Sequence, residues 1–244
     1  MAGTAESAWQ VWPELAALPA LDLAGCRRAV VAAAHPDDEA LGAGGLIATL
    51  LAQGADVHVV TATDGEASHP GSPTVGPTEM ARIRRAEAAA ALAVLGEGLP
   101  AELTGERLGL PDGAVATAQP ALMARLAAAL APADWCFATW VRDGHPDHEA
   151  VGRAAVQACR QVGAAPPAGF PIWTWHWAVP ADSRVPWDRA DRLTLSPSAQ
   201  ARKAAAVACY VSQLSPLSDA PADAAVVPPH MLAHFTRTSE VFFR

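Results

Sequence analysis

The sequence predicts an α/β domain built on a mainly parallel sheet flanked by helices. Two observations point to this class: short apolar runs alternate with alanine-rich amphipathic stretches, and several of the apolar runs end abruptly in His, Asp or Glu. A buried strand that ends in polar residues is typical of an open α/β sheet, where ligands bind beyond the carboxyl ends of the strands. With 244 residues, 51% of them hydrophobic, the chain is long enough for one sizeable core, and we expect a single domain.

The first elements follow one another in a regular order. A strand is expected at about 28–34, and it runs directly into the acidic motif His35-Pro36-Asp37-Asp38-Glu39. The glycine-rich stretch 42–45 is expected to open a helix that Gly54 ends. The β-branched run 57–63 then predicts a second buried strand.

The loop 67–77, with three prolines and two glycines, separates these elements from the next helix. A surface connection is the favoured interpretation, and a lid beside a site is the alternative. A helix is expected from Thr78 to Leu95, capped by Thr78 and stopped by Gly96. The following elements are a strand at 103–108, a helix at 120–130, a strand at 134–140 and a helix at 150–162. This alternation predicts right-handed crossovers between parallel strands.

The last third of the chain departs from the alternation. Residues 170–178 are rich in tryptophan and are expected as a strand, with a short neighbouring strand at 192–195. A helix is expected from Ser196 to Leu214, with Ser196 as its cap and Pro197 in its first turn.

The two ends of the chain are expected to lie on the surface of one domain that spans 1–244. Residues 1–25 are predicted to be a short amphipathic lead-in, and residues 216–244 a proline-rich tail. The tail ends in the run 240–243, which is apolar enough to tuck back onto the body. The core of the domain would then cover about 28–215.

Composition excludes several classes of partner. The net charge is −8 and no Lys/Arg cluster exceeds a pair, so no nucleic-acid partner is expected. No apolar run reaches the length of a membrane span and the N-terminus lacks a signal-peptide pattern, which favours a cytoplasmic protein without a membrane partner. The four cysteines include no Cys-x-x-Cys pair and are interpreted as reduced thiols. A homo-oligomer is compatible with this composition.

Two short motifs carry candidate chemistry, each directly behind an apolar run: His35-Pro36-Asp37-Asp38-Glu39 and His145-Pro146-Asp147-His148. A catalytic zinc site needs three protein ligands from His, Asp, Glu or Cys and one open position for water. His35 and Asp38 lie three residues apart across a proline-containing turn, and His148 comes from a separate strand end. We therefore expect His35, Asp38 and His148 to hold a metal.

Asp37 and His145 remain beside the expected metal, and both are residue types that transfer protons. Asp37 is expected to act as general base for a water that zinc activates. His145, if cationic, would hydrogen-bond the developing oxyanion or protonate the departing amine, with Asp147 orienting its imidazole. The implied reaction is metal-assisted hydrolysis of an acyl bond.

Single histidines are more often satisfied core or loop side chains, which is the interpretation we give to His58 and His69. Two His-Pro-Asp triplets at two strand ends favour a metal site over that interpretation. The stretch 42–45 lacks the full G-x-G-x-x-G order and its turn is acidic, so a nucleotide cradle is not expected.

Further stretches accompany the two motifs in a fixed order: Thr63-Asp64-Gly65-Glu66, Arg84 with Glu87, Leu110-Pro111-Asp112-Gly113, and Lys203 with Ser212-Gln213. With these stretches, the sequence resembles the PIG-L/LmbE-like family of zinc-dependent N-deacetylases. The family includes the N-acetylglucosaminyl-phosphatidylinositol, mycothiol-pathway and bacillithiol-pathway deacetylases. The resemblance covers roughly residues 28–215.

The resemblance implies a Rossmann-like fold and a small-molecule substrate that bears an N-acetyl amino sugar such as N-acetylglucosamine. It implies Zn2+ as cofactor, with another divalent metal such as Fe2+ as the alternative. His35, Asp38 and His148 take the family's ligand positions, Asp37 that of the base, and His145 that of the acid or oxyanion stabiliser. The residues alone lead to the same assignment.

The resemblance also places Arg84 and Asp112 where the sugar or its attached groups are held. Some members have a tyrosine near the second motif that assists the oxyanion, whereas residues 141–144 contain none. That role is therefore either absent here or taken by Arg142.

Two other functions stay open. The same site could hydrolyse an amide in a non-sugar secondary metabolite, or the chain could be a non-catalytic metal-binding module on a Rossmann-like scaffold. The tryptophans of 173–177 are interpreted as core, with an aromatic wall for a sugar ring as the alternative. Glu39 is expected to anchor the motif loop or the helix start, where a carboxylate is favoured.

Overall fold

Seven strands form one sheet in the order β3-β2-β1-β4-β5-β7-β6. The computed structural model describes residues 3–131 and 134–244. Five strands are parallel: β1 (Arg28–Ala33), β2 (Asp56–Thr63), β3 (Leu103–Leu110), β4 (Trp135–Thr139) and β5 (Ala168–Phe170). β7 (Ser239–Phe243) is antiparallel to both β5 and β6 (Ala190–Thr194). The predicted mainly parallel α/β fold is confirmed.

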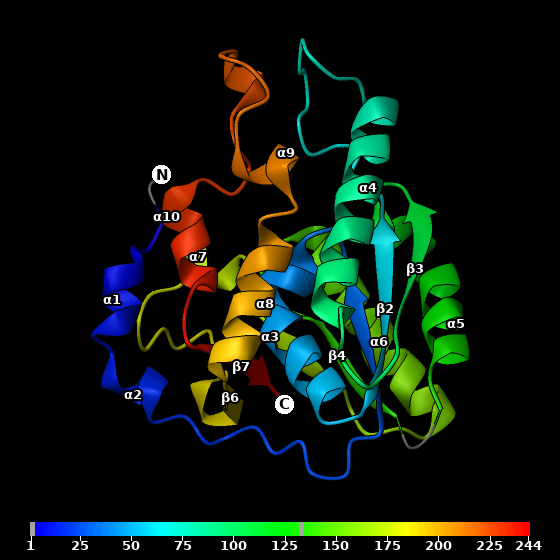
Figure 1. The fold of residues 1–244 in the computed structure, drawn as a ribbon, viewed down its shortest axis with the longest axis vertical. Helices are drawn as coiled ribbons and strands as arrows, with labels where there is room; N and C mark the ends of the chain where they lie inside the picture. Colours follow the sequence, from blue (N-terminus) through cyan, green and yellow to red (C-terminus); the bar gives the residue numbers. More distant parts are fainter. Residues whose placement is uncertain (1–2, 132–133) are drawn as a thin grey trace.

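Helices cover both faces of the sheet (Figure 1). Successive residues of β1 alternate between two cores, because side chains along a strand point to opposite faces: Val31 lies in one core and Val30 in the other. The first core is shared with α3 (Asp38–Ala52), α4 (Pro77–Gly96) and α8 (Pro197–Val207). The second is shared with α5 (Gln119–Ala129) and α6 (Pro146–Val162).

Three helices begin at other residues than predicted. α3 begins at Asp38, so the stretch 42–45 lies inside the helix and does not open it. Its glycines serve close packing, since a Cβ at Gly42 would lie 2.3 Å from Phe170 and one at Gly45 would lie 2.4 Å from Leu195.

The other two helices also begin early. α4 starts at Pro77 after Gly76, and Thr78 does not cap it. α6 starts at Pro146, four residues before the predicted Ala150, because proline is favoured in a first helical turn. The second His-Pro-Asp motif is therefore the beginning of a helix.

The tryptophan-rich segment was predicted wrongly as one long strand. β5 ends at Phe170, and Thr174–Trp177 form the short helix α7. The turn between them is fixed by the buried carboxylate of Asp143, which accepts hydrogen bonds from the backbone N–H groups of Ile172, Trp173 and Thr174 at 2.9, 2.9 and 3.0 Å. A distant carboxylate therefore overrides the strand preference of the tryptophans.

The helix predicted from Ser196 to Leu214 is two helices. Ser196 caps α8 as expected, accepting from the N–H of Ala199 at 3.1 Å. α8 ends at Val207, and α9 (Val211–Leu214) follows. The remaining short elements are α1 (Glu6–Gln10), α2 (Pro13–Ala16), α10 (Pro229–Leu232), η1 (Val115–Ala118), η2 (Trp187–Arg189), η3 (Pro221–Asp223) and η4 (Ala233–Phe235).

The C-terminal tail was expected to pack on the surface of the domain. Its last residues instead form β7, a strand of the sheet. Above the sheet in Figure 1, the loop between β2 and α4 and the segment after α9 rise side by side. Asp223 joins them, because its carboxylate accepts the hydroxyl hydrogens of Ser72 and Thr74 in the loop. Among the described residues, no helix has the length and apolar character that a membrane span would require.

Glu240 of β7 ties the tail to α3, the helix that carries Asp38. Its carboxylate accepts from the N–H groups of Gly45 and Leu46 and pairs with Lys203 of α8, each at 2.8 Å. Lys203 and Glu240 are 5% and 4% exposed, so this ion pair is shielded from water.

Replacing Lys203 with Met should lower the free energy of unfolding by about 3–5 kcal/mol, because the carboxylate of Glu240 would remain buried without its cation. Urea denaturation measures the change. Arg153→Met is the matched control, since Arg153 pairs with Glu149 on the surface at 3.5 Å and its loss should cost about 0–1 kcal/mol. Equal effects of the two substitutions would contradict a structural role for the buried pair.

Candidate active site

The two His-Pro-Asp motifs meet because the strands before them are neighbours. β1 and β4 pair in parallel, with Ala32 opposite Ala138, so both strands end at the same edge of the sheet. From this pair the sheet continues to β2 and β3 on one side and to β5 on the other. This reversal of the strand order leaves a crevice at the carboxyl ends of β1 and β4. His35 and His148 face each other across that crevice.

The three predicted metal ligands converge. His35 Nδ1 lies 3.2 Å from His148 Nε2, and the two carboxylate oxygens of Asp38 lie 3.6 Å from His35 Nδ1 and 3.4 Å from His148 Nε2. Bonds of 2.0–2.2 Å in a tetrahedral site separate two ligand atoms by about 3.3–3.6 Å. The two imidazole nitrogens are close to this spacing and each has one oxygen of Asp38 beside it, so the donor set fits a divalent metal such as zinc.

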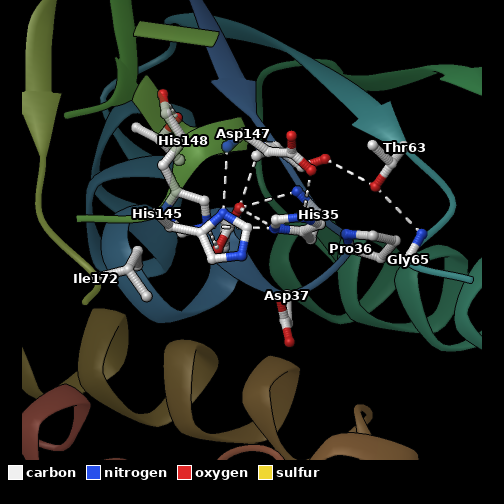
Figure 2. Close-up of polar contacts among 12 residues, drawn as sticks. His35, Pro36, Asp37, Thr63, Gly65, His145, Asp147, His148 and Ile172 are labelled. Atoms are coloured by element: carbon white, nitrogen blue, oxygen red, sulfur yellow. Dashed lines mark hydrogen bonds and ion pairs between the residues drawn. The ribbon is translucent and has the colours of Figure 1, made fainter. Parts of the chain in front are cut away.

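His145 also reaches this cluster (Figure 2). One of its ring nitrogens lies within 4.8 Å of those of His35 and His148, so the three imidazoles could hold an ion together. A second group that could hold an ion combines His35 with Asp112 and Asp147. We favour the cluster at His35 Nδ1, because both oxygens of Asp147 in the second group accept hydrogen bonds from backbone amides, whereas the described amides reach only Oδ2 of Asp38 and leave its Oδ1 for a metal.

The carboxylates of Asp112 and Asp147 orient His35 from its outer side. His35 Nε2 lies 3.1 Å from Asp112 and 3.4 Å from Asp147. Burial disfavours the charged imidazole, but Asp112, Asp147 and Asp38 outweigh it and raise the pKa of His35 well above its ordinary value. Asp147 was expected to orient His145, and its carboxylate instead contacts His35.

His148 is oriented by Asp143, a residue to which the sequence analysis gave no role. His148 Nδ1 lies 2.7 Å from the Asp143 carboxylate, which leaves Nε2 directed at His35 and Asp38. Asp143 is fully buried and also holds the turn before α7. Its place two residues before His145, in Asp-Gly-His-Pro-Asp-His, is the signal that could have identified it.

Asp37 lies beside the cluster, with its carboxylate directed away from the three imidazoles in Figure 2. Arg84 contacts this carboxylate at 3.0 Å and also donates to the backbone oxygens of Pro36 and Gly65. Burial raises the pKa of the Asp37 carboxyl to about 6, against the lowering effect of Arg84. Asp37 has φ +120°, a conformation that an L-residue rarely adopts and that occurs at functional sites.

Gly65 makes room for Arg84. A Cβ at Gly65 would lie 2.2 Å from the guanidinium, and its φ of +69° favours glycine independently. Arg84 and Asp112, the two predicted substrate-binding residues, both line the cavity but are already engaged with the site's own residues.

His145 is the N-cap of α6. Its Nδ1 accepts from the N–H of Asp147 at 3.3 Å, which leaves its hydrogen on Nε2 when the ring is neutral. Burial, His148 and His35 lower the pKa of His145 to about 4. A cationic His145 was one expectation from the sequence, whereas this environment favours a neutral imidazole that donates from Nε2.

Glu39 holds the loop of the first motif by a hydrogen bond to its backbone. Its carboxylate accepts from the backbone N–H of Asp37 at 3.2 Å and from the hydroxyl of Tyr210. Burial raises the pKa of Glu39 to about 7, although the hydrogen bond from Tyr210 opposes this. The side chain therefore contacts the loop that holds Asp37.

The matches to known proteins cover the segment that carries both motifs. A family model described as PIG-L, GlcNAc-PI de-N-acetylase, matches residues 30–159, more than half of the chain. This chain belongs to the PIG-L family. Its homologues are deacetylases, and the predicted family is confirmed.

Relatives extend this result. The 1D-myo-inositol 2-acetamido-2-deoxy-alpha-D-glucopyranoside deacetylase of Rhodococcus erythropolis is 32% identical over 183 residues, which are 64% of this chain and 62% of that protein. The chain thus matches somewhat less than two thirds of that relative's length.

Solved structures share the fold. N,N'-diacetylchitobiose deacetylase from Pyrococcus horikoshii superposes with a TM-score of 0.56 at 20% identity, covering 84% of this chain and 78% of that one. The 4-carboxy-2-hydroxymuconate hydratase GalB from Pseudomonas putida gives 0.55 at 20% identity, covering 86% and 83%. Because a deacetylase and a hydratase share the fold, the reaction has to be argued from the site.

Replacing Asp143 with Asn should weaken zinc binding about 10- to 100-fold, because the ring of His148 loses the carboxylate that orients it. Competition with a chromophoric chelator measures the affinity, and thermal melting shows whether the variant is folded. Asp219→Asn, at an exposed position, is the control and should bind zinc as the parent does. Parent-like zinc affinity in a folded Asp143→Asn protein would contradict the role of Asp143.

Proposed function

We propose that this protein is a metal-dependent hydrolase that removes the acetyl group from a small N-acetylated amino sugar or glycoconjugate. The observation that carries the proposal is the meeting of three ligand-type side chains with Asp37 and His145 in one cavity of a PIG-L family member. The deacetylase relatives support hydrolysis of an amide, and the Rhodococcus relative supports an amino-sugar substrate.

His35 Nδ1, Asp38 and His148 Nε2 would hold the metal. When bound, a metal of this kind polarises a carbonyl and makes water acidic enough to attack near neutral pH. Zinc suits two imidazoles and one carboxylate, and the same three donors also suit Fe2+. Metal analysis of the purified protein distinguishes the two.

The chain's own residues supply the proton transfers. Asp37 accepts a proton from the attacking water, and Arg84 fixes the position of that carboxylate. The water oxygen attacks the amide carbon, while Nε2–H of His145 donates to the developing oxyanion. The carbon–nitrogen bond then breaks, the proton passes to the amine, and acetate and the free amine are the products.

A second candidate is a deacylase that acts on a non-sugar amide. It is favoured by the apolar residues that line part of the cavity, such as Ile172, Val227 and Phe235. A non-catalytic metal-binding module would keep the metal and release no acetate from any N-acetyl amine.

Replacing Asp37 with Asn should lower the rate of acetate release about 10²- to 10⁴-fold, the usual contribution of a general base. The assay follows acetate from N-acetylglucosamine conjugates, with the metal content of both proteins measured in parallel. Asp219→Asn should retain the parental rate because Asp219 is exposed and outside the cavity. Equal rates for Asp37→Asn and the parent would exclude Asp37 as the base.

A further inference from the structure

The cavity at the candidate active site is lined by two chemically different groups of residues. It has a volume of about 330 Å³. The proposed catalytic and ligand residues line one part of it. Six apolar residues from the segments after β5 and after α9 also line it and are here called the apolar wall: Ile172, Trp173, Val226, Val227, Met231 and Phe235. Every residue of the apolar wall lies outside the segment 30–159 that the family model matches.

The apolar wall begins at a catalytic residue. The Trp173 ring stacks on the His145 imidazole, with centroids 5.9 Å apart and planes at 26°. Ile172 and Trp173 are fixed by the Asp143 carboxylate, which also orients His148. A group that occupies this surface therefore lies next to the bond that the site would cleave.

The rest of the wall is also held in place. Val227 N–H donates to the backbone oxygen of Gln213 at 2.9 Å. A few residues earlier, Asp223 binds the hydroxyls of Ser72 and Thr74 in the loop that follows β2. Val227, Met231 and Phe235 are buried, and Val226 is half-buried. Hydrogen bonds and burial therefore fix the residues of the apolar wall in place.

The polar atoms of the cavity offer few positions for additional hydroxyl groups. The terminal nitrogens of Arg84 and both carboxylate oxygens of Asp112 already have partners within the protein. Two cavity-lining side chains keep a buried polar atom without a partner in the described part of the chain, Arg84 at Nε and Gln213 at its side-chain oxygen. The NH2 group of Gln213 donates to Ser212 Oγ, whose own hydrogen goes to Glu87, so the oxygen is the free atom of this amide.

We propose that the apolar wall binds a compact alkyl or aryl group of the substrate next to the scissile amide. This inference rests on the proposed function and specifies its substrate class. Apart from one hydroxyl that could donate to the free Gln213 oxygen, a hydroxyl buried against the wall would lack a partner, which is unfavourable, whereas each CH2 group buried there is favourable. The preferred substrate is therefore an N-acyl amine with an apolar substituent and not an unsubstituted polyhydroxy sugar.

Two chemical sources of the apolar group are separated by a substrate series. N-acetylglucosamine is compared with its phenyl β-glycoside, which carries the group on the amine side, and with N-hexanoylglucosamine, which carries it on the acyl side. We expect kcat/KM for amine release to be at least tenfold higher for one of the two substituted compounds, and that compound identifies the source. A value for N-acetylglucosamine equal to or above both would overturn the proposal.

Calorimetric binding separates failure of this inference from failure of the proposed function. If none of the compounds is hydrolysed, the proposed function fails, and the wall is tested by binding alone. Either phenyl β-glucosaminide should then bind at least tenfold more tightly than glucosamine, or hexanoate at least tenfold more tightly than acetate. Equal affinities within both pairs would overturn the proposal.

A matched pair of variants locates the effect. Val226→Asn places an amide on the wall, and Val179→Asn makes the same change at an exposed position outside the cavity. The preference for the substituted compound over N-acetylglucosamine should fall at least fivefold in Val226→Asn and stay at the parental value in Val179→Asn. An unchanged preference in Val226→Asn would show that the group binds elsewhere.

Discussion

The parallel pairing of β1 with β4 is the constraint on which the candidate site depends. Because side chains alternate along a strand and the register is fixed by two buried faces, Ala32 stays opposite Ala138. The chain beyond each strand then has to turn at the same edge. His35 and His148 are brought to 3.2 Å by this pairing, although 113 positions separate them in the sequence. No local interaction within either motif could produce that contact.

The concentration of buried acids explains why a cation suits this edge of the sheet. Asp38, Asp112, Asp143 and Asp147 surround two imidazoles, and buried carboxylates are costly unless charges or hydrogen bonds compensate them. Burial alone would raise the pKa of Asp38, yet His148 and His35 hold it below its ordinary value. The raised pKa of His35 has the same origin, because a proton on its ring compensates some of the negative charge. A divalent metal at the same place would supply that positive charge and displace the proton.

The sequence was sufficient for what depends on strands and their ends. Strands β1 to β4 and the meeting of His35, Asp38 and His148 follow from apolar runs and from ligand-type residues at their ends, whereas β5 was not predicted at 168–170. The starts of α3 and α6 were missed because a helix can begin within a motif, as proline at its first position allows. The strand predicted at 170–178 failed because Asp143, far away in sequence, binds the backbone there. Contacts of this kind, including that of Asp147 with His35, are decided by tertiary structure and leave no periodic signal.

The proposed catalytic residues and the apolar wall come from different segments of the chain. The proposed ligands, base and acid all lie within 30–159, while the apolar wall comes from the segments after β5 and after α9. Glu240 ties β7 to α3 through the N–H of Gly45 and to α8 through Lys203, so β7 is held in place by contacts outside the cavity. Under the proposed function, substitutions at Val226, Val227, Met231 or Phe235 would change which group fits beside the amide, whereas Ile172 and Trp173 share Asp143 with His148 and are not independent of it. A chitobiose deacetylase and a muconate hydratase share this fold, so the scaffold alone does not decide the reaction.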